Sequence, residues 1–155
     1  SYSTGNVSGA SGAVGGVAGD VVNSSVSGSY SIGTISGSHN VGGVVGLIDN
    51  GINLIENCAA LNPSVTAGST AGRVVGYISG ANTITGNVAW SGMTLTGGTI
   101  VDTSDEDGTD ITTAQVRDGT GLPPALKTAS WSYTAGALPI LIGLAGQTGA
   151  LPAHL

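Results

Sequence analysis

The chain of 155 residues contains no phenylalanine, and only 4% of its residues are aromatic. An ordinary globular core is filled largely by bulky aromatic side chains. Because this chain has few of them and 28 glycines, valine, isoleucine and threonine must fill its interior. β-Branched side chains suit the pleated surface of a strand and lose rotamer freedom in a helix. The composition therefore predicts short strands separated by glycine turns.

Basic residues are also scarce. The chain has three of them, Arg73, Arg117 and Lys127, against nine acidic residues, which gives a formal net charge of −6. A nucleic-acid-binding protein needs a basic stripe to neutralise phosphates, and three scattered cations cannot form one. The same scarcity argues against docking on anionic lipid. We therefore expect neither nucleic acid nor an anionic membrane as a partner.

A single cysteine, Cys58, excludes an internal disulfide framework. We expect Cys58 to be a small buried side chain rather than a reactive thiol. No stretch approaches the roughly 20 apolar residues that span a bilayer, so we expect no membrane insertion. The 40% apolar content indicates one folded domain, and an opening at Ser1 and Tyr2 is typical of a piece cut from a longer protein.

A glycine-rich hexamer occurs three times along the chain. The sequence VGGVAG at residues 14–19 returns as VGGVVG at residues 41–46 and again as AGRVVG at residues 71–76. The residues around the hexamer also recur with the same spacing between the second and third copies. This is stronger evidence for a repeat than the hexamer alone. The matched residues are Leu47 and Ile48 with Tyr77 and Ile78, Leu54 with Ile84, Asn57 with Asn87, Ala59 with Ala89, Val65 and Thr66 with Leu95 and Thr96, and Gly68 with Gly98.

Each repeat contains three short runs of alternating apolar residues, which in the second repeat are residues 30–35, 41–47 and 52–58. One such unit cannot bury its apolar row alone, whereas stacked units form a continuous core. Residues 1–100 therefore predict an all-β fold, a parallel β-helix or β-solenoid in which each repeat takes about 27 to about 30 residues. We expect Val17, Val44 and Val74 to form one buried ladder.

The hexamers, together with YSTGNVSG at residues 2–9 and NCAALNP at residues 57–63, resemble the GLUG repeat. That repeat occurs in large bacterial surface and secreted proteins, including adhesin-like proteins and IgA-cleaving metallopeptidases. Valine here takes the place of its naming leucine, and Arg73 replaces a glycine in the third copy. Residues 107–115 and 131–141 resemble the segment that often closes such arrays. The resemblance implies an extracellular or cell-surface repeat protein.

Two further segments follow the repeats. Residues 101–121 are rich in acids, glycine and threonine and predict an acidic surface loop. Residues 122–155 carry four prolines around apolar runs and predict a C-terminal cap of the same domain. The last coil of a solenoid exposes backbone and core, so we expect Trp131 and residues 138–141 to lie over the open end.

An acidic run is the best candidate metal site, because calcium takes clustered carboxylate oxygens. Its members are Asp102, Asp105, Glu106, Asp107 and Asp110. Their spacing is wrong for an EF-hand, since placing Gly108 sixth puts Thr103 first and Ala114 twelfth. We assign no metal site and interpret the run as a solvated loop, with calcium binding as the alternative.

Groups suited to catalysis are few. The two histidines, His39 and His154, lie in no nucleophile signature, and the zinc-peptidase H-E-x-x-H and the phosphate-binding G-x-x-x-x-G-K motifs are absent. The acids of the regular repeats, Asp20, Asp49 and Glu56, do not recur at one register, as a carbohydrate-active β-helix would need. We expect no enzyme, no catalytic residue and no cofactor.

The sequence leaves three functions open. The leading one is a structural or adhesive module that acts as a spacer or contact surface, with a protein or glycan at the cell surface as partner. The second is a filament subunit that self-associates by end-to-end stacking of its open N-terminal coil. The third is a glycan-binding or carbohydrate-active β-helix. For that role the aromatic residues matter, but we expect Tyr77 and Trp90 to fill or border the core and Trp131 to anchor the cap.

Overall fold

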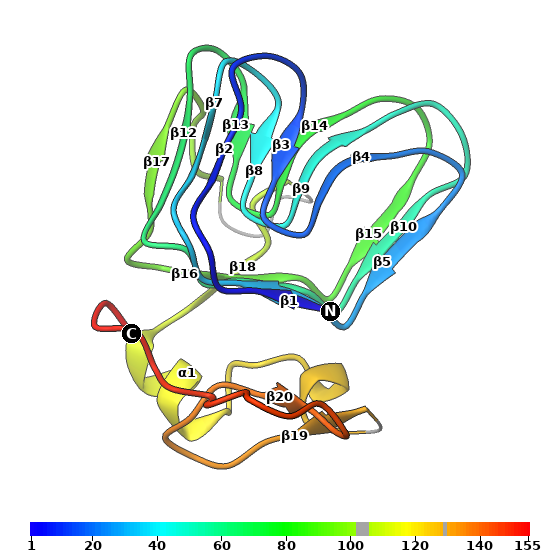
Figure 1. Cartoon of the computed structure of the whole chain (residues 1–155). Coiled ribbons are helices and arrows are strands. Elements are labelled where there is room, and N and C mark those ends of the chain that lie inside the picture. Colours follow the sequence, from blue (N-terminus) through cyan, green and yellow to red (C-terminus); the bar gives the residue numbers. More distant parts are fainter. Residues whose placement is uncertain (102–105, 129) are drawn as a thin grey trace.

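The computed structural model describes residues 1–101, 106–128 and 130–155. Strands of successive repeats lie on one another in parallel and build an all-β solenoid of about three turns, with a repeat of about 29 residues (Figure 1). The predicted β-solenoid is confirmed. Among the described residues, no helix has the length and apolar character that a membrane crossing requires.

Each complete coil contains five short strands. The first has β1 (Tyr2–Ser3), β2 (Val7–Ser8), β3 (Val14–Gly15), β4 (Ala18–Val21) and β5 (Ser25–Ser27). The second has β6 (Tyr30–Ser31), β7 (Ile35–Gly37), β8 (Val41–Gly42), β9 (Val45–Ile48) and β10 (Leu54–Glu56). The third has β11 (Ala59–Ala60), β12 (Ser64–Ala67), β13 (Ala71–Gly72), β14 (Val75–Ile78) and β15 (Thr83–Thr85). A partial fourth coil has β16 (Val88–Trp90) and β17 (Thr94–Thr96), and β18 (Thr109–Ile111) pairs with β16.

The predicted valine ladder lies at the centre of the stack. Val44 and Val74 are fully buried, and Val17 is partly buried against the same core. The backbone N–H of Val17 donates to the carbonyl of Val44 at 2.9 Å, and that of Val44 donates to the carbonyl of Val74 at 3.0 Å. The prediction that these valines form one ladder along the stack is confirmed.

The prediction of one constant shift between the second and third repeats is wrong for part of the third. Strand β14 pairs with β9 at the predicted shift, but β15 pairs with β10 so that Ile84 lies opposite Ile55, and Val88 lies opposite Ala59. The predicted pairs of Leu54 with Ile84 and Ala59 with Ala89 are therefore one residue out of register. The third repeat is one residue shorter than the second at the corner before β15. The difference falls in a corner because a one-residue slip within a strand would turn its apolar side chains outward.

Asparagine side chains bridge the coils at a second corner. The Asn53 side-chain oxygen accepts the backbone N–H of Ser24 at 3.0 Å, and its amide donates to the side-chain oxygen of Asn82 at 2.9 Å. At the next corner, which follows β15, the Asn87 oxygen accepts the N–H of Cys58 at 2.9 Å. Corner backbone groups that lack a strand partner are thus satisfied by side chains, as buried polar groups must be.

Cys58 is fully buried, and its Sγ lies 3.3 Å from the carbonyl oxygen of Glu56. Removal from water raises the pKa of its thiol to about 11. The thiolate is the reactive form. We expect Cys58 to resist Ellman's reagent at pH 8 in the native protein and to react fully in guanidinium chloride. Prompt labelling of the native protein would show that the thiol is accessible.

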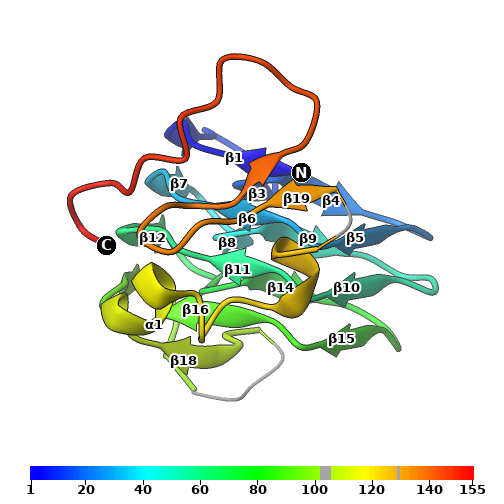
Figure 2. The ribbon, with the colours of Figure 1, turned by 90° about the horizontal axis from the view of Figure 1, so that it is seen from below.

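The C-terminal segment packs against the side of the solenoid. It contains α1 (Thr113–Asp118), η1 (Pro124–Leu126), β19 (Trp131–Ser132) and β20 (Ile140–Leu141). These elements cross the outer face of the five-stranded sheet β1-β6-β11-β16-β18 (Figures 1 and 2). The expectation that Trp131 and residues 138–141 cover the open end is wrong, since the Trp131 ring lies 5.5 Å from that of Tyr30 on this face.

The reason for the lateral packing is that the outward row of this sheet is apolar, so both of its faces need cover. Its outward row begins with Tyr2 and Tyr30 and continues with Ala59 and Val88. Parallel strands buried on both faces need cover on each side. The segment supplies the other side of a second core, in which Ile111 of β18 packs with Val116, Leu122, Leu126, Trp131, Leu138 and Leu155.

Within residues 101–121, the described part contains regular elements where a surface loop was expected. Among those described, β18 extends the five-stranded sheet and α1 follows directly. The Thr112 hydroxyl accepts the N–H of Gln115, and the Gln115 side chain accepts the N–H of Thr112, which forms a capping box. Gly119 ends the helix at φ 76°. The T-x-x-Q spacing followed by glycine was a helix signal that the sequence interpretation missed.

Candidate functional site

The C-terminal end of the solenoid is closed at the corner between β13 and β14. The carbonyl of Glu106 accepts the N–H groups of Val74 and Val75 at 2.8 and 2.9 Å. The Asp107 carboxylate accepts the N–H of Arg73 at 2.9 Å and that of Val101 at 2.7 Å. These residues therefore take the place that a further coil would occupy on this corner.

Arg73 stands where the other two hexamers have glycine, and its side chain is only 1% exposed. Its guanidinium hydrogen-bonds the carboxylate of Asp110, donates to the carbonyl of Gly108 at 3.2 Å, and lies 3.9 Å from the carboxylate of Asp107. Asp107 is buried with it, whereas the Asp110 side chain is 45% exposed. Arg73 is therefore in contact with two members of the acidic run, the buried Asp107 and the half-exposed Asp110.

This contact changes the interpretation of the acidic run as a solvated loop. The part that contains Asp107 covers the solenoid, and Asp102 and Asp105 lie outside the described residues. Within the residues that are described, no group of three or more His, Cys, Asp and Glu side chains is placed to hold a metal ion. The alternative of calcium binding gains no support from the placement of Asp107 and Asp110 around Arg73.

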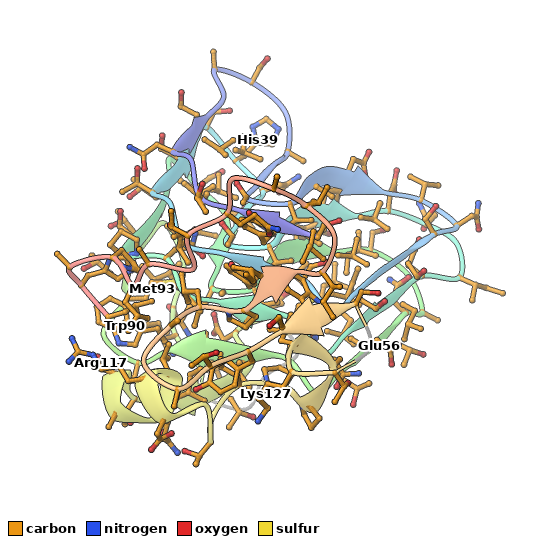
Figure 3. All side chains as sticks on the ribbon, turned by 60° about the horizontal axis from the view of Figure 1, so that its bottom comes forward. His39, Glu56, Trp90, Met93, Arg117 and Lys127 are labelled. Atoms are coloured by element: carbon orange, nitrogen blue, oxygen red, sulfur yellow. The ribbon has the colours of Figure 1, made fainter. Side chains whose placement is uncertain are left out.

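The histidines and the other charged side chains that could take part in catalysis or ligand binding are spread around the molecule. Figure 3 shows His39, Glu56, Arg117 and Lys127 at separate places. His39 is exposed beside Ser38. His154 packs against Trp90 with ring centroids 5.0 Å apart, and its Nε2 lies 2.8 Å from the carbonyl oxygen of Leu61. The structure does not bring the two histidines together with the repeat acids.

The aromatic residues fall into two groups. On the lateral sheet the Tyr2 and Tyr30 rings stack, and the Trp131 ring lies tilted against both. Trp90 borders both cores, and its indole N–H donates to the Thr113 hydroxyl at 3.0 Å. The expectation that Trp90 borders the core is confirmed, whereas Trp131 anchors the C-terminal segment on the lateral sheet and not over the open end. Tyr77 was expected to fill or border the core, and this is wrong, because its side chain is 45% exposed on β14.

The corner between β8 and β9 explains the error. Residues 41–47 form two strands with a bend between them, so strict alternation through the hexamer does not hold. Tyr77 lies opposite Leu47, which lies opposite Asp20, and this row faces outward from the sheet β14-β9-β4. We call this outward row the Tyr77 face. It is a candidate contact surface, because exposed tyrosine is enriched at protein interfaces.

A cleft of about 400 Å³ lies between the β5–β10 side of the solenoid and the C-terminal segment. Its walls include Ser27, Glu56, Asn57, Thr128 and Trp131. Hydroxyl, amide and carboxylate groups beside an indole are suited to a small polyhydroxylated ligand. No family model, curated protein or solved structure matches the chain, so its function is argued from this geometry.

Proposed function

We propose that the chain is a non-catalytic structural or adhesive repeat module that acts as a spacer and contact surface. The supporting observation is that all three of its cations are engaged in holding the fold. Arg73 binds the end-closing segment, Arg117 donates to the carbonyl of Leu155 at 2.6 Å, and Lys127 donates to that of Gly119 at 2.7 Å. Enzymes that cleave acidic polysaccharides need such charges over the substrate instead.

We also propose that the module is located outside a bacterial cell or on its surface. The resemblance of the hexamers to the GLUG repeat supports it. The architecture suits a spacer as well, because backbone hydrogen bonds tie each coil to the next and make the stack stiff. The module would hold a neighbouring domain at a fixed distance and present its flat faces to a partner.

The Tyr77 face is the part of this surface that we propose makes contact. Beads carrying the protein should be retained on mucin-coated or fibronectin-coated glass under flow. We expect Tyr77→Ser to lower retention several-fold, since interface energy concentrates in large aromatic side chains. The matched control is Ile100→Ser, which removes an apolar side chain of similar exposure, 44% against 45%, elsewhere on the surface.

Three results would count against the proposal. One is retention of the wild-type beads no greater than that of uncoated beads. Another is equal retention for Tyr77→Ser and the wild type. The third is release of reducing ends from the mucin, which would favour the carbohydrate-active alternative that the polar cleft beside Trp131 keeps open.

Growth of a filament by head-to-tail stacking is a weaker proposal. It would require the first coil of one copy to meet the last coil of another. The segment containing Glu106 and Asp107 already lies across one corner of the third coil, the last complete one. An added coil would have to displace these hydrogen bonds and the buried Arg73 contact.

A further inference from the structure

The corner between β9 and β10 is longer than its counterpart in the first coil. Strand pairing leaves residues 22–24 as the corner of the first coil and residues 49–53 as that of the second. The longer corner lies at the outer edge of the solenoid, away from the C-terminal segment (Figure 1). Asn50 and Gly51 are exposed there, and the side chain that follows them, Ile52, is 88% exposed.

This corner contains the one place in the chain where glycine follows asparagine. The side-chain carbonyl carbon of an asparagine, Cγ, can be attacked by the backbone nitrogen of the next residue. Gly51 hinders this attack least, because it carries no Cβ atom. Within the described part of the chain, the Gly51 N–H donates no hydrogen bond to another group, so its nitrogen is not held in the backbone ladder.

Hydrogen bonds to two neighbours order the side chain of Asn50. The Asp49 carboxylate accepts the backbone N–H of Asn50 at 2.7 Å and its side-chain amide at 3.1 Å, which holds the side chain in one orientation. From the next coil, the Ser79 hydroxyl donates to Oδ1 of Asn50 at 3.4 Å. Attack at Cγ places negative charge on Oδ1, so a hydroxyl donor at this oxygen stabilises the intermediate.

We propose that Asn50 is a site of spontaneous covalent modification, promoted by Ser79, at which asparagine is converted to aspartate and isoaspartate. The Gly51 nitrogen forms a bond to Cγ of Asn50, and the bond from Cγ to Nδ2 breaks. The side-chain nitrogen leaves as ammonia and takes the proton that the Gly51 nitrogen loses. Water then opens the resulting succinimide ring. Hydrolysis of the new bond at Cγ gives aspartate, and hydrolysis of the original peptide bond gives isoaspartate.

Other asparagines at the corners are less well placed for this reaction. The side chains of Asn53 and Asn87 are buried and hydrogen-bonded between coils. Asn57 precedes Cys58, whose backbone N–H is engaged by the Asn87 oxygen. Asn62 precedes a proline, which has no N–H to lose. The fold therefore favours modification at Asn50 over these positions.

The modification would change the charge of the corner. A new carboxylate would lie beside Asp49, and the isoaspartate form would lengthen the backbone by one methylene group. Both changes fall outside the strands, so the stack of coils stays intact. The new charge would lie just after β9, whose Leu47 belongs to the Tyr77 face. This inference goes beyond the proposed function and does not depend on it.

The test follows the native protein during incubation at pH 8 by isoelectric focusing and by peptide mapping with mass spectrometry. We expect an acidic form whose changed residue is Asn50, present as both aspartate and isoaspartate. It should form at least as fast as in the same protein unfolded in guanidinium chloride, because the fold orders the reacting side chain. Asn53 and Asn87 should convert about tenfold more slowly in the native protein than in the unfolded one, because their side chains are held between coils.

Variants separate the roles of the residues. Asn50→Gln should abolish the acidic form, because the longer side chain closes a less favourable ring. Ser79→Ala should slow its formation several-fold, whereas Ser36→Ala, at an exposed serine on β7, should leave the rate unchanged. Circular dichroism of each variant confirms that it is folded. The proposal is overturned if another asparagine converts first, if unfolding speeds conversion of Asn50 about tenfold, or if Ser79→Ala reacts as fast as Ser36→Ala.

Discussion

Replacing Gly42 by alanine is expected to lower the free energy of unfolding by about 3 kcal/mol or more. A Cβ atom at this position would lie 2.0 Å from the carbonyl oxygen of Val45 and 2.6 Å from the backbone nitrogen of Gly76. Both neighbours are backbone atoms, one in the same coil and one in the next. Neither can rotate aside as a flexible side chain could, so relief requires the coils to separate.

The matched control is Gly5→Ala. A Cβ at Gly5 meets no heavy atom within 4 Å, and its φ lies outside the left-handed region. We expect its stability to stay within about 0.5 kcal/mol of the wild type. Urea unfolding followed by far-UV circular dichroism measures both variants, and the melting temperature of Gly42→Ala should fall by roughly 10 °C. Similar midpoints for the two variants would mean that the coils are not in contact at Gly42.

The glycine and valine pattern was sufficient to predict the solenoid. A glycine two residues before a pair of valines marks the corner where neighbouring coils touch, and its recurrence in residues 41–46 and 71–76 predicts the stacking. The registers of Val65 with Leu95 and of Ile48 with Ile78 follow from the same pattern. Local repetition carries this information because each repeat contacts mainly its neighbours.

The end closure could not be predicted in this way. Arg73 was visible as a departure from the repeat, and Asp107 as part of an acidic run, but the two residues lie far apart in the sequence. The local sequence pattern of neither segment indicates that it contacts the other. Pairing an unusual buried charge with an acid outside the repeats is a physical rule that would have suggested the contact, because lone buried charges are costly.

The lateral packing of the C-terminal segment was missed for a related reason. Residues 52–58 were interpreted as an alternating run, but the next two residues, Ala59 and Ala60, are both fully buried. Small side chains on both faces, with Tyr30 stacked on the outward row, are typical of a sheet that is covered twice. The apolar side chains of residues 122–155 were expected to cover the end of the stack, because the exposed end of a solenoid generally needs cover.

Removal of the Asp107 carboxylate should produce the largest loss among the charged residues. We expect Asp107→Ala to lower the free energy of unfolding by about 3 to 5 kcal/mol, as when one partner of a buried ion pair is removed. The arginine side chain of the contact is 1% exposed and would keep Asp110 and the Gly108 carbonyl as partners. The N–H groups of Arg73 and Val101 would also lose their acceptor.

Asp110→Ala provides the control at the same guanidinium. Its side chain is 45% exposed, so water screens its charge and the expected loss is within about 1 kcal/mol. In a double-mutant cycle, Arg73→Ala and Asp107→Ala together should cost less than the sum of the single changes by about 1 to 3 kcal/mol, because each residue compensates the burial of the other. Urea unfolding of the four proteins measures this coupling. Strict additivity, or equal losses for Asp107→Ala and Asp110→Ala, would show that Asp107 does not hold the end of the solenoid closed through Arg73.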